Sequence, residues 1–191
     1  MTTSPESPWF PIRTERLLLR EFRADDCDDV HAYAADLDTV RFMDWGPNTL
    51  EATRERVDLM LTEQSAWPRA EVNLAVELIE QSRLIGATRL SLDGRGGADV
   101  GYCYGGAYWR KGYGYEAAMT VVTVGFETLR LHRVWATCDV RNGGSIAILE
   151  KLGMRREGTL SKNQQVRDGW RDTYIYALLD EEWAARQGKG F

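Results

Sequence analysis

Apolar residues follow two different periods along the chain, and Gly, Pro, Asn and Asp mark where one period gives way to the other. Short apolar runs between such turn residues are typical of strands, whereas apolar residues three and four apart predict helices. The predicted strands are residues 16–22, 72–79, 83–92, 99–104 and 133–140, with one or two more through 173–179. The predicted helices run from 25 to about 38, from 49 to 67, from 115 to about 129 and from 142 to 153.

This order begins with one strand, two helices and a three-strand meander, and it ends with alternating helices and strands. It predicts a mixed α/β (α+β) fold around a single sheet. We expect one domain over residues 12–183, a flexible N-terminal arm at 1–11 and a polar tail at 184–191. No internal repeat or linker divides the domain.

Composition narrows the class of protein. A net charge of −5 argues against nucleic-acid binding, which needs a basic face. No apolar run approaches the roughly 20 residues that span a bilayer, and residues 1–11 lack the apolar core of a secretory signal. The three cysteines, Cys27, Cys103 and Cys138, have no metal-ligand spacing, so we expect reduced thiols, no metal and a cytoplasmic location.

The segment with the most chemical information is Trp109-Arg110-Lys111-Gly112-Tyr113-Gly114-Tyr115-Glu116-Ala117. Glycine allows a tight turn and a close backbone approach to a ligand. A helix that begins there directs free N–H groups and a positive dipole end at an anion, and two basic residues precede the turn. The residues alone leave two interpretations open: a diphosphate-binding nest, or an ordinary strand-to-helix turn.

Four motifs together resemble one family. They are Thr14-Glu15-Arg16-Leu17-Leu18-Leu19-Arg20, Asp99-Val100-Gly101-Tyr102, the glycine turn, and Asn142-Gly143-Gly144-Ser145 leading into Glu150-Lys151-Leu152-Gly153-Met154. In this order and spacing, residues 12–183 resemble the GNAT N-acetyltransferases, closest to the ribosomal-protein N-terminal (alanine) acetyltransferase-like branch. The resemblance implies a mostly antiparallel twisted sheet of about seven strands, splayed between the fourth and fifth, with about four flanking helices. It also implies acetyl-CoA as donor and a primary amine as acceptor.

The resemblance assigns a coenzyme A site. The glycine turn would bind the pyrophosphate through backbone amides, and the preceding strand would pair with the pantetheine arm. The expected cofactor-binding residues are Tyr102, Cys103, Tyr104, Arg110, Lys111, Gly112, Tyr113, Gly114, Tyr115, Asn142 and Ser145. Arg110 and Lys111 have the alternative of being ordinary solvated surface charges. Cys103 as an acyl carrier is disfavoured, because the family transfers the acetyl group directly.

Asp99 is the candidate general base, since some family members place a catalytic carboxylate at this position. The branch usually has Glu there, so the shorter Asp predicts a water relay; the alternative is a strand-end carboxylate that faces solvent. Glu21 is a second candidate base, and Glu116 is expected to stabilise its helix N-terminus. Ser145 is the candidate donor to the departing thiolate and Asn142 lies beside the pantetheine, although either can cap the helix. Tyr174 and Tyr176 are second candidates for the acid.

The acceptor side is expected to include Trp45, Asn48, Trp170 and Asp172, the last within a hairpin turn at 168–172. Ordinary packing is the alternative for the tryptophans. The acceptor is a protein N-terminus, an amine-bearing peptide or a small amine, and the protein is a monomer or homodimer. A non-catalytic acyl-CoA-binding module stays open as a second class of function. An unrelated nucleotide-binding domain is disfavoured, because the turn lacks the GxxxxGK[ST] pattern.

Overall fold

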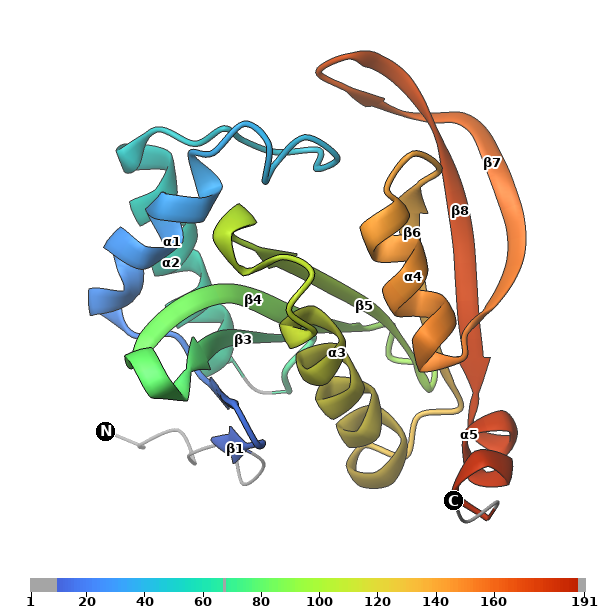
Figure 1. Ribbon diagram of the computed structural model, residues 1–191. Coiled ribbons are helices and arrows are strands. Elements are labelled where there is room, and N and C mark those ends of the chain that lie inside the picture. The colour runs from blue at the N-terminus through green and yellow to red at the C-terminus, as the bar shows by residue number, and fades with distance from the viewer. Residues whose placement is uncertain (1–9, 67, 189–191) are drawn as a thin grey trace.

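The computed structural model describes residues 10–66 and 68–188, which form one eight-stranded open sheet with helices on both faces (Figure 1). The strands are β1 (Ile12–Arg13), β2 (Leu17–Arg20), β3 (Glu71–Leu78), β4 (Arg83–Leu92), β5 (Gly97–Tyr104), β6 (Arg133–Asp139), β7 (Arg155–Val166) and β8 (Gly169–Leu179). The helices are α1 (Cys27–Ala34), α2 (Leu50–Ser65), α3 (Tyr113–Thr123), α4 (Gly143–Leu152) and α5 (Asp180–Gln187). The spatial strand order is β1-β2-β3-β4-β5-β6-β8-β7.

The sheet opens at its one parallel pair. β5 and β6 are paired only from Gly97 with Arg133 to Asp99 with Trp135, whereas every other neighbouring pair is antiparallel. Beyond Asp99, β5 follows β4 and β6 follows β8, so the two strands diverge (Figure 1). The backbone of each strand loses its neighbour along the divergent edge, and unpaired backbone groups there are available to a ligand.

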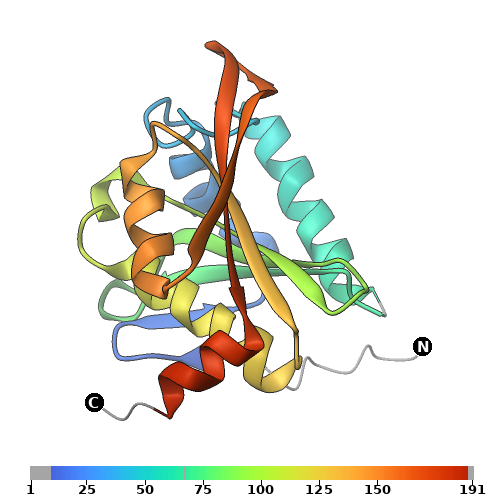
Figure 2. The same cartoon turned by 90° about the vertical axis from the view of Figure 1, so that its right-hand side faces the viewer.

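Two apolar clusters hold the helices on opposite faces of the sheet. The larger one includes Val121 of α3 and Leu149 of α4, and the smaller one includes Val30 of α1 and Val57 of α2. Figure 2 shows α2 and α4 on either side of the strands. Because successive strand residues point to opposite faces, the parity of a residue on β5 decides which pair of helices it meets.

The predicted mixed fold, the meander and the splay are confirmed, and the differences lie at the two ends of the chain. β1 adds an eighth strand. Residues 184–187, predicted as the start of a polar tail, instead belong to α5, whose buried Trp183 stacks on Phe126 at 5.4 Å between ring centroids. A helix with one apolar anchor shows no apolar period, which explains the error.

The late strands also differ from the prediction. β7 is an edge strand on which nearly every residue is exposed, so it shows no alternation to detect. The hairpin predicted at 168–172 is present, but its turn is shorter and lies earlier: Val166 pairs with Gly169, so the turn is residues 167–168, and Trp170 to Asp172 lie within β8. α3 starts two residues earlier than predicted and ends in a π-helical turn, Val124–Thr128.

Most of the predicted N-terminal arm lies outside the described residues. Among the residues that the structure describes, no helix is long and apolar enough to cross a membrane.

Candidate active site

The glycine turn forms a nest at the start of α3. Gly112 is the residue before the helix and has φ +85°, a conformation that favours glycine. The first helical hydrogen bond runs from Glu116 N–H to the Gly112 carbonyl, so the N–H groups of residues 113–115 have no intrahelical acceptor. Arg110 also has a positive φ of 59°. Arg110, Lys111 and Gly112 are all exposed, so the turn fits an incoming anion.

Gly114 has a different role from Gly112. A Cβ atom at Gly114 would lie 3.0 Å from Ile148 Cδ1 and 3.2 Å from Tyr104 Cε2. Gly114 therefore allows α3 to pack closely against α4 and β5. Of the two glycines in the motif, Gly112 shapes the turn and Gly114 fixes the helix that follows it.

A polar contact joins the two sides of the splayed sheet. Asn142 caps α4, where its Oδ1 accepts from the Ser145 N–H at 3.1 Å, which confirms the predicted cap. The Ser145 hydroxyl in turn lies 3.0 Å from the Tyr102 hydroxyl of β5. Two predicted site residues from distant segments thus meet between β5 and α4, and each hydroxyl can donate a proton or accept one.

The cysteines near the divergent strands are poor nucleophiles. Burial raises the pKa of the Cys103 thiol to about 12. Burial also raises the pKa of Cys138 to about 11, although its hydrogen bond with Ser145 opposes the rise. A thiol with such a pKa is protonated at neutral pH, and only the thiolate attacks readily. This chemistry agrees with direct transfer rather than an acyl-cysteine.

Asp99 lies at the last position at which β5 pairs with β6, on the opposite strand face from Tyr102. Its side chain is 18% exposed, and its Oδ2 accepts from Arg89 at 2.6 Å. Burial raises the pKa of Asp99, and the charge and hydrogen bond of Arg89 oppose that rise. A carboxylate whose pKa moves toward neutrality is better matched to general-base chemistry.

The second candidates for acid and base are engaged elsewhere. The Tyr176 hydroxyl donates to Glu150 Oε1 of α4 at 3.2 Å. The Tyr174 ring stacks under the Arg156 guanidinium at 4.6 Å. Glu21 forms an ion pair with Arg69 at 2.6 Å. These contacts favour Ser145 and Tyr102 over Tyr174 and Tyr176 as the acid. Asp99 and Glu21 are each paired with an arginine at 2.6 Å, so the ion pairs do not decide between the two candidate bases.

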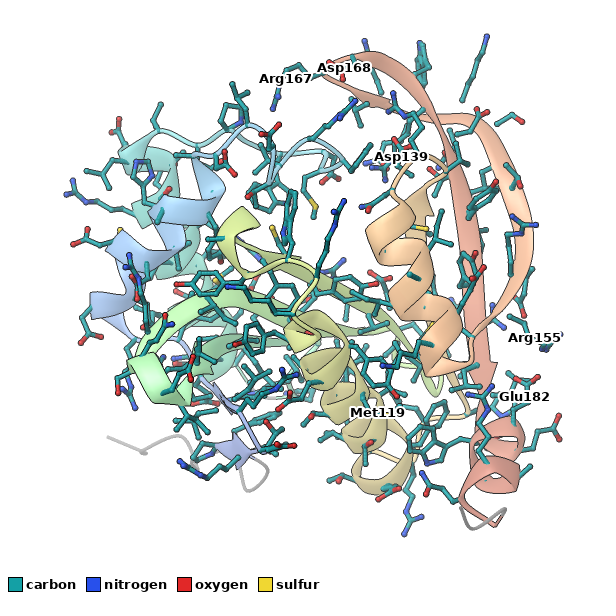
Figure 3. All side chains as sticks on the ribbon, viewed as in Figure 1. Met119, Asp139, Arg155, Arg167, Asp168 and Glu182 are labelled. Carbon is teal, nitrogen blue, oxygen red and sulfur yellow. The ribbon has the colours of Figure 1, made fainter. Side chains whose placement is uncertain are left out.

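Hydrogen bonds tie the loop before α2 to the β7–β8 hairpin. Arg171 Nη1 donates to the Phe42 carbonyl at 2.7 Å, Gln164 Nε2 to Asp44 at 2.8 Å, and Arg167 Nη2 to the Gly46 carbonyl at 2.7 Å. We call these three contacts the clasp. The loop and the hairpin lie above the open side of the splay (Figure 1), and Arg167 marks the hairpin tip (Figure 3).

The clasp brings together the segments that carry the predicted acceptor residues. Trp45 is 39% exposed on the loop and Trp170 is 62% exposed on the hairpin. The Asn48 backbone N–H donates to Ala34 and so fixes the loop against α1. Asp172 accepts from the Lys162 N–H at 2.7 Å, a contact that shapes the hairpin.

Comparison with known proteins decides the family. The model of the family "Acetyltransferase (GNAT) domain" matches residues 16–155. The chain belongs to the GNAT acetyltransferase family. The N-acetyltransferase YnaD of Bacillus subtilis, whose own activity is uncharacterised, is 34% identical over 90% of this chain and 98% of its own. The crystal structure of a GNAT-family acetyltransferase from Bacillus anthracis is 35% identical, covers 90% of this chain and 99% of its own, and superposes with a TM-score of 0.80.

A protein of known acceptor is a more distant relative of this acetyltransferase. The ribosomal protein uS5-alanine N-acetyltransferase of Escherichia coli is 30% identical over 54% of this chain and 55% of its own. GNAT acetyltransferases use acetyl-CoA and an amine acceptor. Among residues 10–66 and 68–188, no cluster of His, Cys, Asp or Glu could hold a metal ion.

Sequence reasoning missed three features of this acetyltransferase. Arg16 reaches the glycine turn from the β1–β2 connection, 95 residues away from Lys111, whose carbonyl it contacts. The contact of the Tyr102 hydroxyl with Ser145 is not among the predictions, although both residues are expected to bind the cofactor. The clasp joins residues more than a hundred positions apart. The parity of β5 could have indicated Tyr102, whereas the other two depend on tertiary packing alone.

Replacing Ser145 by Ala should lower kcat of the acetyltransferase roughly 10- to 100-fold, because the leaving thiolate loses its proton donor. The KM for acetyl-CoA should change by less than about threefold, since only one neutral hydrogen bond is removed. Tyr176→Phe is the matched control and should keep its rate. Steady-state kinetics decide this, and full activity in Ser145→Ala would remove Ser145 as the donor.

Proposed function

We propose that this acetyltransferase moves the acetyl group of acetyl-CoA directly to a primary amine. The observation that supports this most strongly is the alignment of one site along the splay. The Gly112 nest lies at the start of α3, and the Tyr102–Ser145 contact lies between the divergent strands. A long ligand with an anionic end and a reactive thioester end matches both parts.

Each residue of the site has a defined part in this proposal. The amides of residues 113–115 bind the diphosphate, and the exposed Arg110 and Lys111 add charge. Acetyl-CoA supplies the activated acetyl thioester. Ser145, with Tyr102 behind it, donates a proton to the departing sulfur. Asp99, through a water molecule, accepts the proton that the ammonium must lose before it attacks.

We further propose that the acceptor is a small amine. The clasp supports this, since it spans the open side of the splay and leaves less room for an extended chain. The uS5-alanine acetyltransferase, whose acceptor is a protein N-terminus, is the basis for the alternative. The α-amine of a peptide has a pKa of about 8, whereas a lysine-like amine has a pKa of about 10.4. A small alkylamine is therefore more fully protonated at neutral pH, and its proton is harder for the base to remove.

A thiol-release assay with acetyl-CoA tests both proposals, the transfer to a primary amine and the choice of a small amine as acceptor. Amino acids, polyamines and aminoglycosides form one arm, and tri- and hexapeptides that begin with Ala or Ser form the other. We expect turnover with members of the first arm. Turnover with peptides alone would contradict the small-amine proposal. Calorimetric binding of CoA with no turnover in either arm would favour the non-catalytic module.

Opening the clasp should widen acceptor choice. In the double variant Gln164→Ala with Arg167→Ala, two of the three contacts are lost, and Arg171 keeps its bond to the Phe42 carbonyl but loses the one it donates to Gln164. We expect kcat/KM for peptides to rise at least about fivefold relative to small amines, because about 1 kcal/mol of discrimination is removed. Arg155→Ala, which changes the same sheet edge far from the hairpin tip, is the control (Figure 3). An unchanged ratio would show that the clasp does not select the acceptor.

A further inference from the structure

Glu116 places a negative charge in the first turn of α3, directly beside the nest. Burial raises the pKa of Glu116, but hydrogen bonds from Thr14 and Arg16 outweigh that effect and the pKa is lowered. Glu116 is therefore ionised at neutral pH. A carboxylate stabilises a helix N-terminus, yet it also repels a diphosphate that binds to the same amides.

Arg16 neutralises this carboxylate. Its Nε donates to Glu116 Oε2 at 2.7 Å, and its Nη2 lies 2.6 Å from the same oxygen. The other oxygen, Oε1, accepts from the Thr14 hydroxyl at 2.6 Å and from the Arg16 backbone N–H at 3.1 Å. The β1–β2 connection thus occupies both oxygens of Glu116.

The same guanidinium reaches into the turn itself. Arg16 Nη1 donates to the Lys111 carbonyl at 2.9 Å, and the guanidinium stacks over the Tyr113 ring at 4.6 Å. A Cβ atom at Gly112 would lie 3.2 Å from Arg16 Nη2. The side chain of Arg16 is still 40% exposed. One group therefore contacts the residues on both sides of Gly112.

We infer that Arg16 is a positioning residue for the diphosphate: it cancels the charge of Glu116 and fixes the Lys111–Gly112 peptide so that the amides of residues 113–115 face an anion. This inference rests on the proposed function, in which the turn binds coenzyme A. It assigns to the first motif of the chain a part in donor binding, although that motif lies about a hundred residues before the turn.

Calorimetric titration with CoA tests the inference in four variants, with melting temperature as a second readout. Arg16→Met should weaken CoA binding about tenfold, because the charge of Glu116 is uncovered at the nest. Arg16→Lys keeps the charge but loses the planar fork that contacts Glu116 and the Lys111 carbonyl together, so its CoA affinity should lie between those of the parent protein and Arg16→Met. Glu116→Gln should bind CoA as tightly as the parent or more tightly. The double variant Arg16→Met with Glu116→Gln should bind CoA more tightly than Arg16→Met, since no charge is left to cancel, but less tightly than the parent, because the Lys111–Gly112 peptide has lost its contact with Arg16.

The ion pair of Arg155 with Glu182 is a matched control. Glu182 lies in the first turn of α5 and is paired with Arg155 of β7 at 2.6 Å (Figure 3). It is therefore, like Glu116, a carboxylate at a helix N-terminus that is paired with an arginine from another element. Arg155→Met and Glu182→Gln should change the melting temperature without changing CoA affinity.

Three results would overturn the inference. One is unchanged CoA affinity in Arg16→Met. Another is a double variant as weak as Arg16→Met. The third, which applies even if Arg16→Met does not fold, is weaker CoA binding in Glu116→Gln at an unchanged melting temperature. If the parent protein itself does not bind CoA, the proposed function fails instead, so the two failures are distinguishable.

Discussion

Gly112→Glu is expected to weaken CoA binding by more than about 100-fold, the largest effect of any single substitution in the site. Gly112 has φ +85°, which a residue with a Cβ atom adopts only at a cost. The new carboxylate would also stand where the diphosphate binds, beside Arg16. Calorimetry with CoA measures the loss, and thermal melting shows that the chain is still folded.

Gly94→Glu is the control that separates the effect of backbone strain from the effect of a carboxylate in the diphosphate site. Gly94 has φ +67° in the turn between β4 and β5, and a Cβ atom there would meet no other atom within 4 Å. The two variants therefore share the backbone strain and the added charge. We expect a similar fall in melting temperature for both and normal CoA affinity for Gly94→Glu. Equal CoA affinity in the two variants would remove the glycine turn from the donor site.

Asp99→Asn is expected to lower kcat by about 100-fold or more, the usual contribution of a general base. Acetyl-CoA affinity should not change, because Asp99 faces away from Tyr102 and Ser145. The loss should be greatest at low pH, where removal of the ammonium proton limits the rate. The pH dependence of kcat/KM measures this, and a profile equal to that of the parent protein would show that Asp99 is not the base.

The pKa of Asp99 also predicts how stability responds. The pKa of Asp99 is higher in the folded protein than in the unfolded chain, so folding favours the protonated carboxyl. The free energy of unfolding therefore falls as pH rises through the folded pKa. At neutral pH a neutral Asn should therefore leave the melting temperature unchanged or raise it. Glu71→Gln is the control: Glu71 also contacts Arg89, at 3.7 Å, and its charge contributes to the raised pKa of Asp99. Its loss should move the pH profile to lower pH but leave kcat at neutral pH unchanged.

The local geometry of the proposed donor side could be predicted from the sequence because its determinants are local. Gly112 requires a positive φ, the amides after it are free because a helix begins, and Asn142 caps the next helix three residues before Ser145. Each of these features depends on residues that are close together in the sequence. The strands likewise follow from alternation of apolar and polar residues, and the order of helices and strands then limits the possible strand orders of the sheet.

The missed features depend on contacts between distant segments. β7 is exposed on both faces and shows no apolar period, and α5 depends on one buried residue, Trp183. Arg16 looks like any charged residue at a strand end until folding places it over Tyr113. The proposed acceptor side depends on the clasp, whose partners lie in an irregular loop and a hairpin. Such contacts leave no spacing signal in the sequence.

Hydrogen–deuterium exchange of the unmodified protein, with and without CoA, tests the central claim most directly, because it locates the bound ligand on the chain. The account predicts slower exchange at residues 112–116, along residues 100–104 of β5 and at residues 142–146. The pocket between α1 and β4, about 320 Å³ and lined by residues such as Tyr33 and Arg83, is an alternative place for a ligand. Protection of that pocket without protection at residues 112–116 would contradict the account.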